Sequence, residues 1–206
     1  PHVESSLMDA VLSLDIGGTK MAASILAADG TLLAKVREPS RAREGPAPMI
    51  ERLLKMSRRA VATAGARVTT VGISAGGPLD PVAGIILNPP NLPGWDRTPL
   101  RAMIAEGLGI AASRVHLEND ANACALAELH FGAGRGRRHF VFLTMSTGLG
   151  GGLILDGRLY RGAAFNAGEV GHQVVVPGGP PCGCGGRGCL EAVASGSGIA
   201  SRLRER

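Results

Sequence analysis

A cluster of potential metal ligands between residues 166 and 191 is the feature that most restricts how this chain can fold. The cluster contains Cys182, Cys184 and Cys189, and His172 lies ten residues before the first of them. Three thiolates and one imidazole form a ligand set typical of a closed tetrahedral zinc site. The glycines between the cysteines let the backbone turn tightly enough for three sulfur atoms to meet at one ion. The pattern predicts a zinc-stapled loop; two disulfides, or free thiols beside an unrelated histidine, are the alternatives.

Two carboxylates flank this predicted loop. Glu169 precedes His172, and Glu191 follows the last cysteine. If zinc fixes the loop, we expect both carboxylates to face a polar ligand. His172 could serve both zinc and that ligand, because one ring nitrogen can bind the metal while the other meets the ligand.

The composition restricts the class of protein and its partners. With 206 residues, 45% of them apolar, the chain can bury a core as one large domain or two small ones. The net charge of +5 comes from scattered arginines with only 3% aromatic residues, which argues against nucleic acid as a partner of this segment. No run reaches the roughly 18 apolar residues of a membrane span and the first residues show no signal-peptide pattern, so we expect no membrane partner. A thiol-rich metal site suits a reducing compartment, and we expect a cytoplasmic protein.

Hydrophobic periodicity and turn residues predict an α/β domain with a mixed sheet. Three antiparallel strands open the domain, and strands alternate with helices after them. The expected helices are 46–65, 100–108 and 121–131, and the expected strands are 11–16, 21–27, 31–36, 68–74, 85–87, 115–118, 139–145, 153–155 and 158–160.

Two glycine-rich turns have the composition of phosphate-binding loops. The first, DIGGTK, begins at Asp15, and the second runs from Ser146 to Gly152. Glycine lets backbone N–H groups approach a phosphate, and Asp15 could organise a hydrated Mg²⁺. Neither turn is a Walker A loop or a Rossmann fingerprint, and two ordinary turns are the alternative. The residues expected to clamp the phosphates of a nucleotide are Asp15, Gly17, Gly18, Thr19, Lys20, Ser146, Thr147, Gly148, Gly150 and Gly151.

Asn119 and Asp120 lie where a predicted strand meets a predicted helix. In phosphoryl transfer an aspartate can accept the proton of the attacking hydroxyl. Asp120 could instead only cap the first turn of the helix. Together with Glu169, His172 and Glu191, these two side chains offer the polar partners that the hydroxyls of a sugar require.

Six motifs follow one another along the chain: DIGGTK, SAGGP, ENDANACALAE, STGLGGGLILDG, GEVGH and CGCGGRGCLE. In this order they resemble the ROK family (repressors, open reading frames and kinases), and most of all its glucokinase-type members. The resemblance runs from about Met8 to the last residue. It implies an actin-like, hexokinase-type ATPase fold of the ribonuclease H-like class, whose two lobes close over MgATP and a sugar. The implied reaction is phosphorylation of a hexose at its 6-hydroxyl, with glucose expected first.

The resemblance also assigns roles to individual residues. Asp120 matches the catalytic base. The zinc ligands correspond to His172, Cys182, Cys184 and Cys189, and the two phosphate loops to the turns named above. The positions that match the sugar site are Gly76, Gly77, Asn91, Asn119, Asp120, Glu169, His172 and Glu191.

The resemblance further suggests how the chain is divided. We expect an N-terminal lobe over residues 8–120, the beginning of a second lobe over 121–206, and a tail over 1–7. Because family kinases are longer, we expect the chain to lack the part of the second lobe that supplies the adenosine pocket. Family members are commonly dimers, so a homodimer is expected for the full-length protein.

A sugar-responsive repressor of the same family is the main alternative function, and a non-catalytic sugar-binding fragment is another. Such repressors carry a helix-turn-helix before the first phosphate loop, and only 14 residues precede Asp15 here. We therefore expect no DNA-reading element in this segment. N-acetylmannosamine, N-acetylglucosamine, fructose and allose stay open as substrates, because discrimination among hexoses depends on pocket shape.

Overall fold

The computed structural model describes residues 7–204, and the chain divides between Asp120 and Ala121 into two compact units. Of the tail expected over residues 1–7, only Leu7 belongs to the described residues, where it is exposed. Within the described range, no helix has the length and hydrophobicity that crossing a membrane requires.

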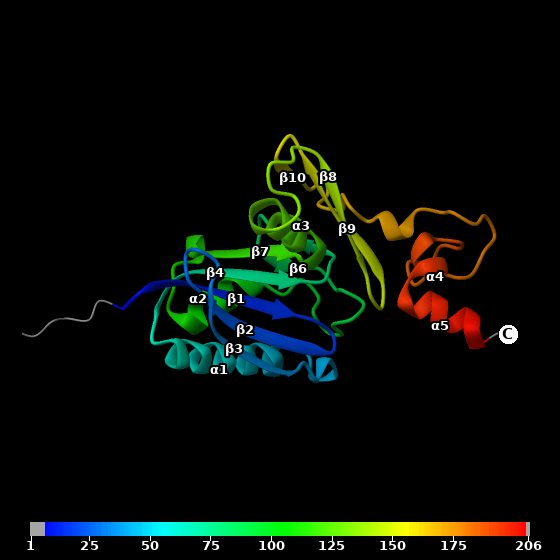
Figure 1. Ribbon diagram of the computed structural model, residues 1–206. Coiled ribbons are helices and arrows are strands. Elements are labelled where there is room, and N and C mark those ends of the chain that lie inside the picture. The colour runs from blue at the N-terminus through cyan, green and yellow to red at the C-terminus, as the bar shows by residue number, and fades with distance from the viewer. Residues whose placement is uncertain (1–6, 205–206) are drawn as a thin grey trace, which may run out of the picture. The chain divides into compact units, whose positions relative to one another are not determined.

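The first unit is built on a five-stranded mixed sheet with the strand order β3-β2-β1-β4-β7 (Figure 1). Its strands are β1 (Asp9–Ile16), β2 (Lys20–Leu26), β3 (Leu32–Pro39), β4 (Arg67–Ala75) and β7 (Val115–Asn119). β1, β2 and β3 pair antiparallel, whereas β1 pairs parallel with β4 and β4 parallel with β7. The predicted mixed sheet and its three opening antiparallel strands are confirmed.

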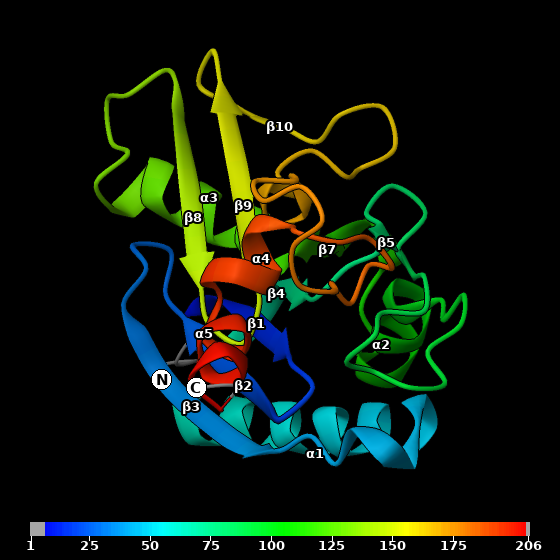
Figure 2. The same cartoon turned by 90° about the vertical axis from the view of Figure 1, so that its right-hand side faces the viewer.

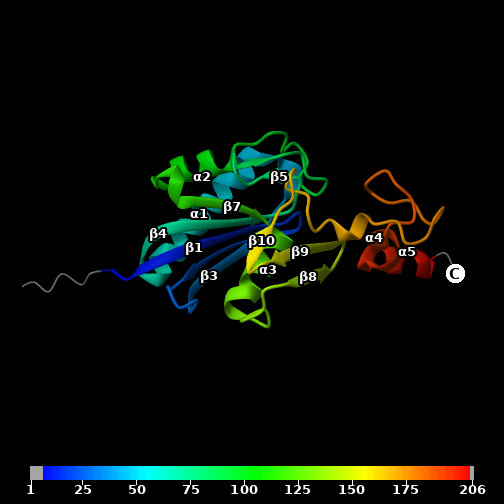
Figure 3. The same cartoon turned by 90° about the horizontal axis from the view of Figure 1, so that it is seen from above.

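Two helices, α1 (Pro46–Ala64) and α2 (Leu100–Leu108), cover one face of this sheet (Figure 3). α1 begins at a proline and ends before Gly65, whose φ of 59° is left-handed, so both ends carry their usual helix signals. Gly107 of α2 lets the helices approach closely, because a Cβ at that position would lie 2.4 Å from Cδ1 of Leu54 in α1.

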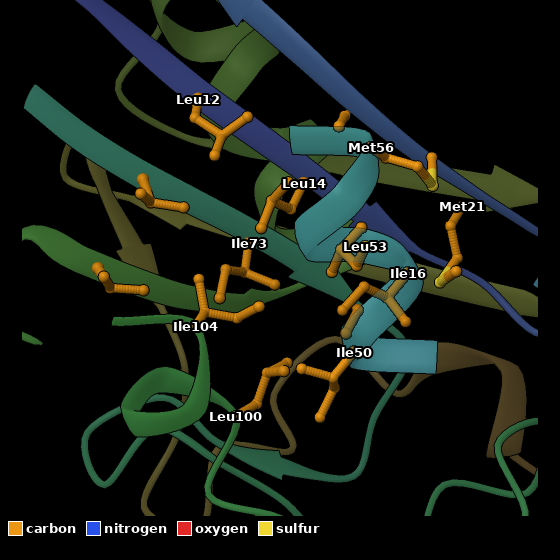
Figure 4. Close-up of a cluster of buried hydrophobic side chains, with 14 of the residues drawn as sticks. Leu12, Leu14, Ile16, Met21, Ile50, Leu53, Met56, Ile73, Leu100 and Ile104 are labelled. Carbon is orange, nitrogen blue, oxygen red and sulfur yellow. The ribbon is translucent and has the colours of Figure 1, made fainter. Parts of the chain in front are cut away.

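The core of the first unit lies between the sheet and these helices (Figure 4). Every second residue of β1, namely Leu12, Leu14 and Ile16, is at most 1% exposed, as the two-residue period of a strand requires. Leu53 and Met56 of α1 are fully buried in the same cluster. Each of these side chains contributes roughly 1.5–3 kcal/mol by leaving water. The core therefore holds β1 and its neighbours firmly in place.

The connection between β4 and α2 contains a short hairpin and an anchored loop. β5 (Leu79–Asp80) and β6 (Ile85–Ile86) form a two-stranded sheet, of which only the second strand was predicted, because two residues are too short to show a period. In the following loop Leu92 and Trp95 are buried. These two side chains anchor the loop that carries Asn91. The first unit also contains the short helices η1 (Ala42–Glu44) and η2 (Ala112–Arg114).

The second unit begins at Ala121, the second residue of α3. It contains the rest of that helix and a three-stranded antiparallel sheet with the order β10-β9-β8 (Figure 2). Two short helices follow the segment that carries the cysteines. The elements are α3 (Asp120–Phe131), β8 (Phe140–Met145), β9 (Leu149–Leu155), β10 (Arg158–Tyr160), η3 (Val170–His172), α4 (Leu190–Ala194) and α5 (Gly196–Arg204).

The glycine-rich turn expected over residues 146–152 is shorter in the structure. Met145 of β8 pairs with Leu149 of β9, so the turn contains only residues 146–148. Gly152 lies inside β9, and a Cβ there would lie 2.6 Å from Cβ of Ala125 in α3. Glycine inside a strand often marks such a close approach, and the sequence pattern alone does not distinguish it from a turn.

Candidate functional site

The carboxyl ends of three parallel strands meet at one edge of the first unit. Ile16 of β1 pairs with Ala75 of β4, and Ala75 pairs in turn with Asn119 of β7. The residues that follow these positions therefore emerge at the same edge, which is where α/β sheets commonly bind ligands. They are Gly17 and Gly18 after β1, Gly76 and Gly77 after β4, and Asp120 after β7.

Two close contacts tie the predicted residues of this edge together. A Cβ on Gly77 would lie 3.3 Å from Nδ2 of Asn119, so this glycine packs directly beside the amide. A Cβ on Gly18 would lie 2.8 Å from the backbone oxygen of Asn91, so the hairpin after β1 packs against the loop anchored by Trp95. The structure thus brings the Gly17–Gly18 turn, the Gly76–Gly77 loop, Asn91 and Asn119 to one edge of the sheet.

The surroundings of Asp15 at this edge disfavour the ionised form of its carboxyl group. Its side chain keeps contact with solvent, but the surrounding protein removes part of its hydration, and this raises the pKa of the carboxyl. The negative charge of Asp120 raises it further, while Lys35 and Arg37 act in the opposite direction. A carboxylate pair of this kind suits a site that receives a cation together with a polar ligand.

A surface depression of about 670 Å³ opens beside the hairpin after β1. Three of its lining residues were predicted from sequence motifs, whereas Arg41 and Arg43 belong to no motif. Both belong to the segment after β3, and Arg41 forms an ion pair of 3.7 Å with Glu44, so the wall carries charges of both signs. The residues that line the depression are Gly18, Thr19, Arg41, Ala42, Arg43, Glu44, Asn91 and Pro93.

In the second unit, Glu191 contacts the turn between β8 and β9. The N–H of Leu149 donates a hydrogen bond of 2.9 Å to Oε2 of Glu191. A Cβ on Gly148 would lie 2.6 Å from the same oxygen, so any larger residue would displace this carboxylate from the N–H of Leu149. Gly151 has a packing role as well, since a Cβ there would lie 3.1 Å from the backbone oxygens of Gly168 and Phe142. Neither packing role has a signal in the sequence pattern.

The four predicted metal ligands converge in the second unit. The ligand atoms of His172, Cys182, Cys184 and Cys189 all lie within 4.8 Å of one another. Sγ of Cys184 lies 3.7 Å from Sγ of Cys189, and Nδ1 of His172 lies 3.6 Å from Sγ of Cys182. Tetrahedral zinc with its usual bond lengths has S···S edges of about 3.8 Å and N···S edges of about 3.6 Å. The donor set and its spacing therefore fit zinc.

The thiol chemistry of the cluster agrees with this geometry. A disulfide requires sulfur atoms about 2.05 Å apart, and Cys182, Cys184 and Cys189 form no disulfide in the structure. Burial raises the pKa of Cys189 to about 11, and the hydrogen bonds in which its S–H is the donor to Cys184 and Cys182 act in the same direction. The backbone N–H of Gly186 lowers the pKa of Cys184. A bound dication would favour the thiolate form of every cysteine in the cluster.

His172 presents its two ring nitrogens to different groups. Nδ1 lies on the side of Cys182, whereas Nε2 lies 3.8 Å from Oε2 of Glu169. The histidine and Glu169 are both partly exposed. The arrangement therefore allows a metal on one ring nitrogen and a polar ligand on the other.

The sequence model of the ROK family matches residues 11–206 of the chain. The chain belongs to the ROK family. A curated relative, the glucokinase of Thermotoga maritima, is 41% identical over 195 residues, which are 95% of this chain and 60% of the relative. The N-acetylmannosamine kinase of Citrobacter koseri is 40% identical over 92% of this chain and 63% of its own length. The chain thus spans about 60% of the length of these relatives.

Solved structures of the family resemble the chain in three dimensions. The ROK hexokinase of Thermus thermophilus is 44% identical with a TM-score of 0.81, covering 96% of this chain and 65% of that one. The ROK glucokinase of Streptomyces griseus, solved with glucose and AMPPNP, is 36% identical with a TM-score of 0.80, covering 95% and 60%. A ROK transcriptional regulator, a homologue of the E. coli MLC protein, is 29% identical with a TM-score of 0.82, covering 98% and 50%. These likenesses confirm the actin-like, hexokinase-type ATPase fold expected from the motifs.

Proposed function

We propose that the protein to which this chain belongs is an ATP-dependent sugar kinase that phosphorylates a hexose at its 6-hydroxyl, with glucose as the first candidate. The observation that carries the proposal is the sheet edge where Asp15, the Gly17–Gly18 turn and the Asn119–Asp120 pair emerge together. The relatives and solved structures named as glucokinases support the same reaction.

In this mechanism Asp120 is the catalytic base. Its carboxylate takes the proton of the sugar hydroxyl as the hydroxyl oxygen attacks the terminal phosphorus of ATP. The bond from that phosphorus to the bridging oxygen breaks, and ADP leaves with the electron pair. Asn119, beside Gly77, would orient the sugar from the first unit. Glu169, His172 and Glu191 would meet the remaining hydroxyls.

Two metal ions belong to the proposal. A hydrated Mg²⁺ would neutralise charge on the phosphates, and Asp15 is the residue that would hold its water shell. Zinc would be structural, held by His172, Cys182, Cys184 and Cys189, and would fix the segment that leads to Glu191. The two turns, residues 17–19 and 146–148, would supply backbone N–H groups to the nucleotide phosphates. We further propose a cytoplasmic homodimer, as the family resemblance suggests.

The substrate is tested by measuring ADP release with MgATP against a panel of hexoses. The panel contains glucose, N-acetylmannosamine, N-acetylglucosamine, fructose and allose, and the assay uses the full natural reading frame beside this chain. Glucose is expected to give the highest kcat/KM. A higher kcat/KM for N-acetylmannosamine would instead assign the protein as an N-acetylmannosamine kinase, the name that the Citrobacter koseri relative carries. Absence of turnover with every sugar in the full reading frame would overturn the proposal.

A sugar-responsive regulator is the second candidate, because the chain is similar to a ROK transcriptional regulator over 98% of its length. The discriminating measurement is selective enrichment of genomic DNA fragments by the full-length protein, with and without sugar. Sequence-specific, sugar-sensitive enrichment without ADP release would replace the kinase assignment. ADP release without such enrichment would support it.

A further inference from the structure

Ser40 holds the turn of residues 17–19, called here the first hairpin. This serine is fully buried directly after β3. Its hydroxyl donates a hydrogen bond of 2.5 Å to the backbone oxygen of Gly17, and its N–H donates one of 2.9 Å to the backbone oxygen of Thr19. Arg52 of α1 donates from Nη1 to the backbone oxygen of Ser40 at 2.7 Å. Two carbonyl groups of the hairpin are therefore turned toward one buried serine.

Ser197 holds the turn of residues 146–148, called here the second hairpin, in a similar way. Its hydroxyl donates a hydrogen bond of 2.6 Å to the backbone oxygen of Thr147. The preceding N–H, that of Gly196, donates one of 2.8 Å to the backbone oxygen of Ser146. Both donors lie at the start of α5, beside the end of the β8–β9 hairpin (Figure 2). Again two carbonyl groups of a glycine-containing turn are bound from one side.

The direction of the hydroxyl bonds in the second hairpin follows from the donor count. A carbonyl oxygen only accepts, so the single hydroxyl proton of Ser197 goes to Thr147. Oγ of Ser195 lies 3.0 Å from Oγ of Ser197 and must therefore donate its own proton to it. Ser195 is fully buried, and its oxygen accepts the N–H of Gly198 at 3.1 Å. This chain of hydrogen bonds leaves Ser197 one orientation.

The planarity of the peptide bond links these carbonyl groups to the opposite face of each hairpin. In a trans peptide the C=O and the N–H of the next residue point in opposite directions. Fixing the carbonyl of Gly17 thus aims the N–H of Gly18 away from Ser40. Fixing the carbonyl of Thr147 aims the N–H of Gly148 away from Ser197. Outward N–H groups with the carbonyl oxygens turned back are what a phosphate requires of a backbone turn.

We propose that Ser40 and Ser197 are positioning residues that keep the carbonyl oxygens of the two hairpins away from the nucleotide phosphates. This inference rests on the proposed kinase function. Without the serine hydroxyls, the carbonyl of Gly17 loses the bond from Ser40, and the carbonyl of Thr147 keeps only the longer bond of 3.3 Å from the N–H of Ser197. Each peptide unit can then turn its negative oxygen toward the phosphate more easily. The same arrangement occurs in each unit on residues distant in sequence, so the two hairpins support the inference separately.

The test measures nucleotide binding by calorimetry on the full natural protein. Ser197→Ala and Ser40→Ala are compared with wild type, and Ser197→Thr restores the hydroxyl. Loss of one such hydrogen bond is expected to weaken AMPPNP binding about tenfold. AMP, which has no β- or γ-phosphate, is expected to bind each variant as it binds wild type, and Ser197→Thr to recover most of the AMPPNP affinity.

Matched controls separate positioning from a general loss of stability. Ser57 is also fully buried and donates to the backbone oxygen of Leu53 inside α1 at 2.8 Å, so Ser57→Ala removes a comparable bond far from either hairpin. Thr63 is exposed and donates to the backbone oxygen of Arg59 at 3.0 Å, so Thr63→Val is the control for Ser197. Both controls are expected to leave AMPPNP binding unchanged.

The outcomes distinguish the inference from the function on which it rests. Equal AMPPNP affinity in wild type and both serine variants, or equal weakening of AMPPNP and AMP, would overturn the positioning role while leaving the kinase proposal intact. Selective weakening of AMPPNP with no sugar phosphorylated would support the positioning role and count against the kinase. A wild-type protein that binds no nucleotide would overturn both.

Discussion

Asp15 and Asp120 lie at the ends of β1 and β7, the two strands that flank β4, and the negative charge of Asp120 raises the pKa of Asp15. Two carboxylates that repel each other at the edge of a sheet are unfavourable for folding. They are useful in a site that must bind a cation, accept a proton and position phosphates. In the proposed kinase, Asp120 accepts the proton of the sugar hydroxyl and Asp15 holds the water shell of Mg²⁺.

The first prediction is that Asp15→Asn raises the melting temperature at pH 7 by a few degrees while abolishing turnover. Because the folded-state pKa of Asp15 is raised, its ionisation disfavours the folded state. Stability is therefore lost as the pH rises from the ordinary value of 3.8 through the raised pKa, and the substitution removes that loss. The difference between the variant and wild type should shrink as the pH falls toward 3.8. Thermal unfolding of wild type and variant, from pH 7 down toward 3.8, measures this difference in melting temperature.

Asp29→Ala provides a control of the opposite sign. The carboxylate of Asp29 accepts the N–H of Thr31 at 2.9 Å, and this bond lowers its pKa. Its contribution to stability is present above the ordinary value of 3.8 and is lost as the pH falls through the lowered pKa. Asp29→Ala should therefore lower the melting temperature at pH 7. If Asp15→Asn also lowers it, the electrostatic account of the site is wrong.

The second prediction concerns the metal. Freshly purified, reduced protein should contain close to one equivalent of zinc, and Cys184→Ser should release it and lower the melting temperature by roughly 5–10 °C. Cys124 lies on α3 outside the cluster, so Cys124→Ser should change neither quantity. Elemental analysis with thermal unfolding checks both. Less than half an equivalent of zinc in the wild-type protein would contradict the zinc assignment.

The third prediction concerns the contact between Gly148 and Glu191. Gly148→Ala places a methyl group where Oε2 of Glu191 accepts the N–H of Leu149, so the carboxylate must swing away and give up this hydrogen bond. The loss should cost about 0.5–1.5 kcal/mol of stability and lower kcat/KM. A methyl group on Gly183 would meet open space, and the φ of this glycine is not left-handed, so Gly183→Ala should be close to neutral. Denaturant unfolding and steady-state kinetics measure the difference. Two variants of equal stability and activity would show that the carboxylate contact is dispensable.

Much of the fold could be predicted from the sequence because its elements carry strong local signals. Leu12, Leu14 and Ile16 alternate with more exposed residues, as a strand with one buried face requires. α1 has a proline at its start and Gly65 at its end, and its predicted bounds agree closely with the structure. The pattern of cysteines and His172 predicts that their ligand atoms converge, and they do.

The features that were missed depend on contacts between distant segments. The sequence pattern predicts Gly151 and Gly152 in a turn, whereas both lie in β9. They are glycines because neighbouring backbone atoms and α3 leave no room for a side chain. Ser40 and Ser197 belong to no motif, and their partners lie 23 and 50 residues away in sequence. Arg41 likewise joins the depression beside the first hairpin only through the fold. Local patterns carry no information on such pairings.

The most direct test of the central claim is the turnover and sugar binding of Asp120→Asn in the full natural protein. With MgATP and the best sugar of the panel, kcat should fall by about 100- to 10,000-fold, because the general base is lost while the amide keeps its shape. Sugar affinity, measured by calorimetry without nucleotide, should stay within a few-fold of wild type. Unchanged turnover would contradict the assignment of Asp120 as the base, and with it the proposed mechanism.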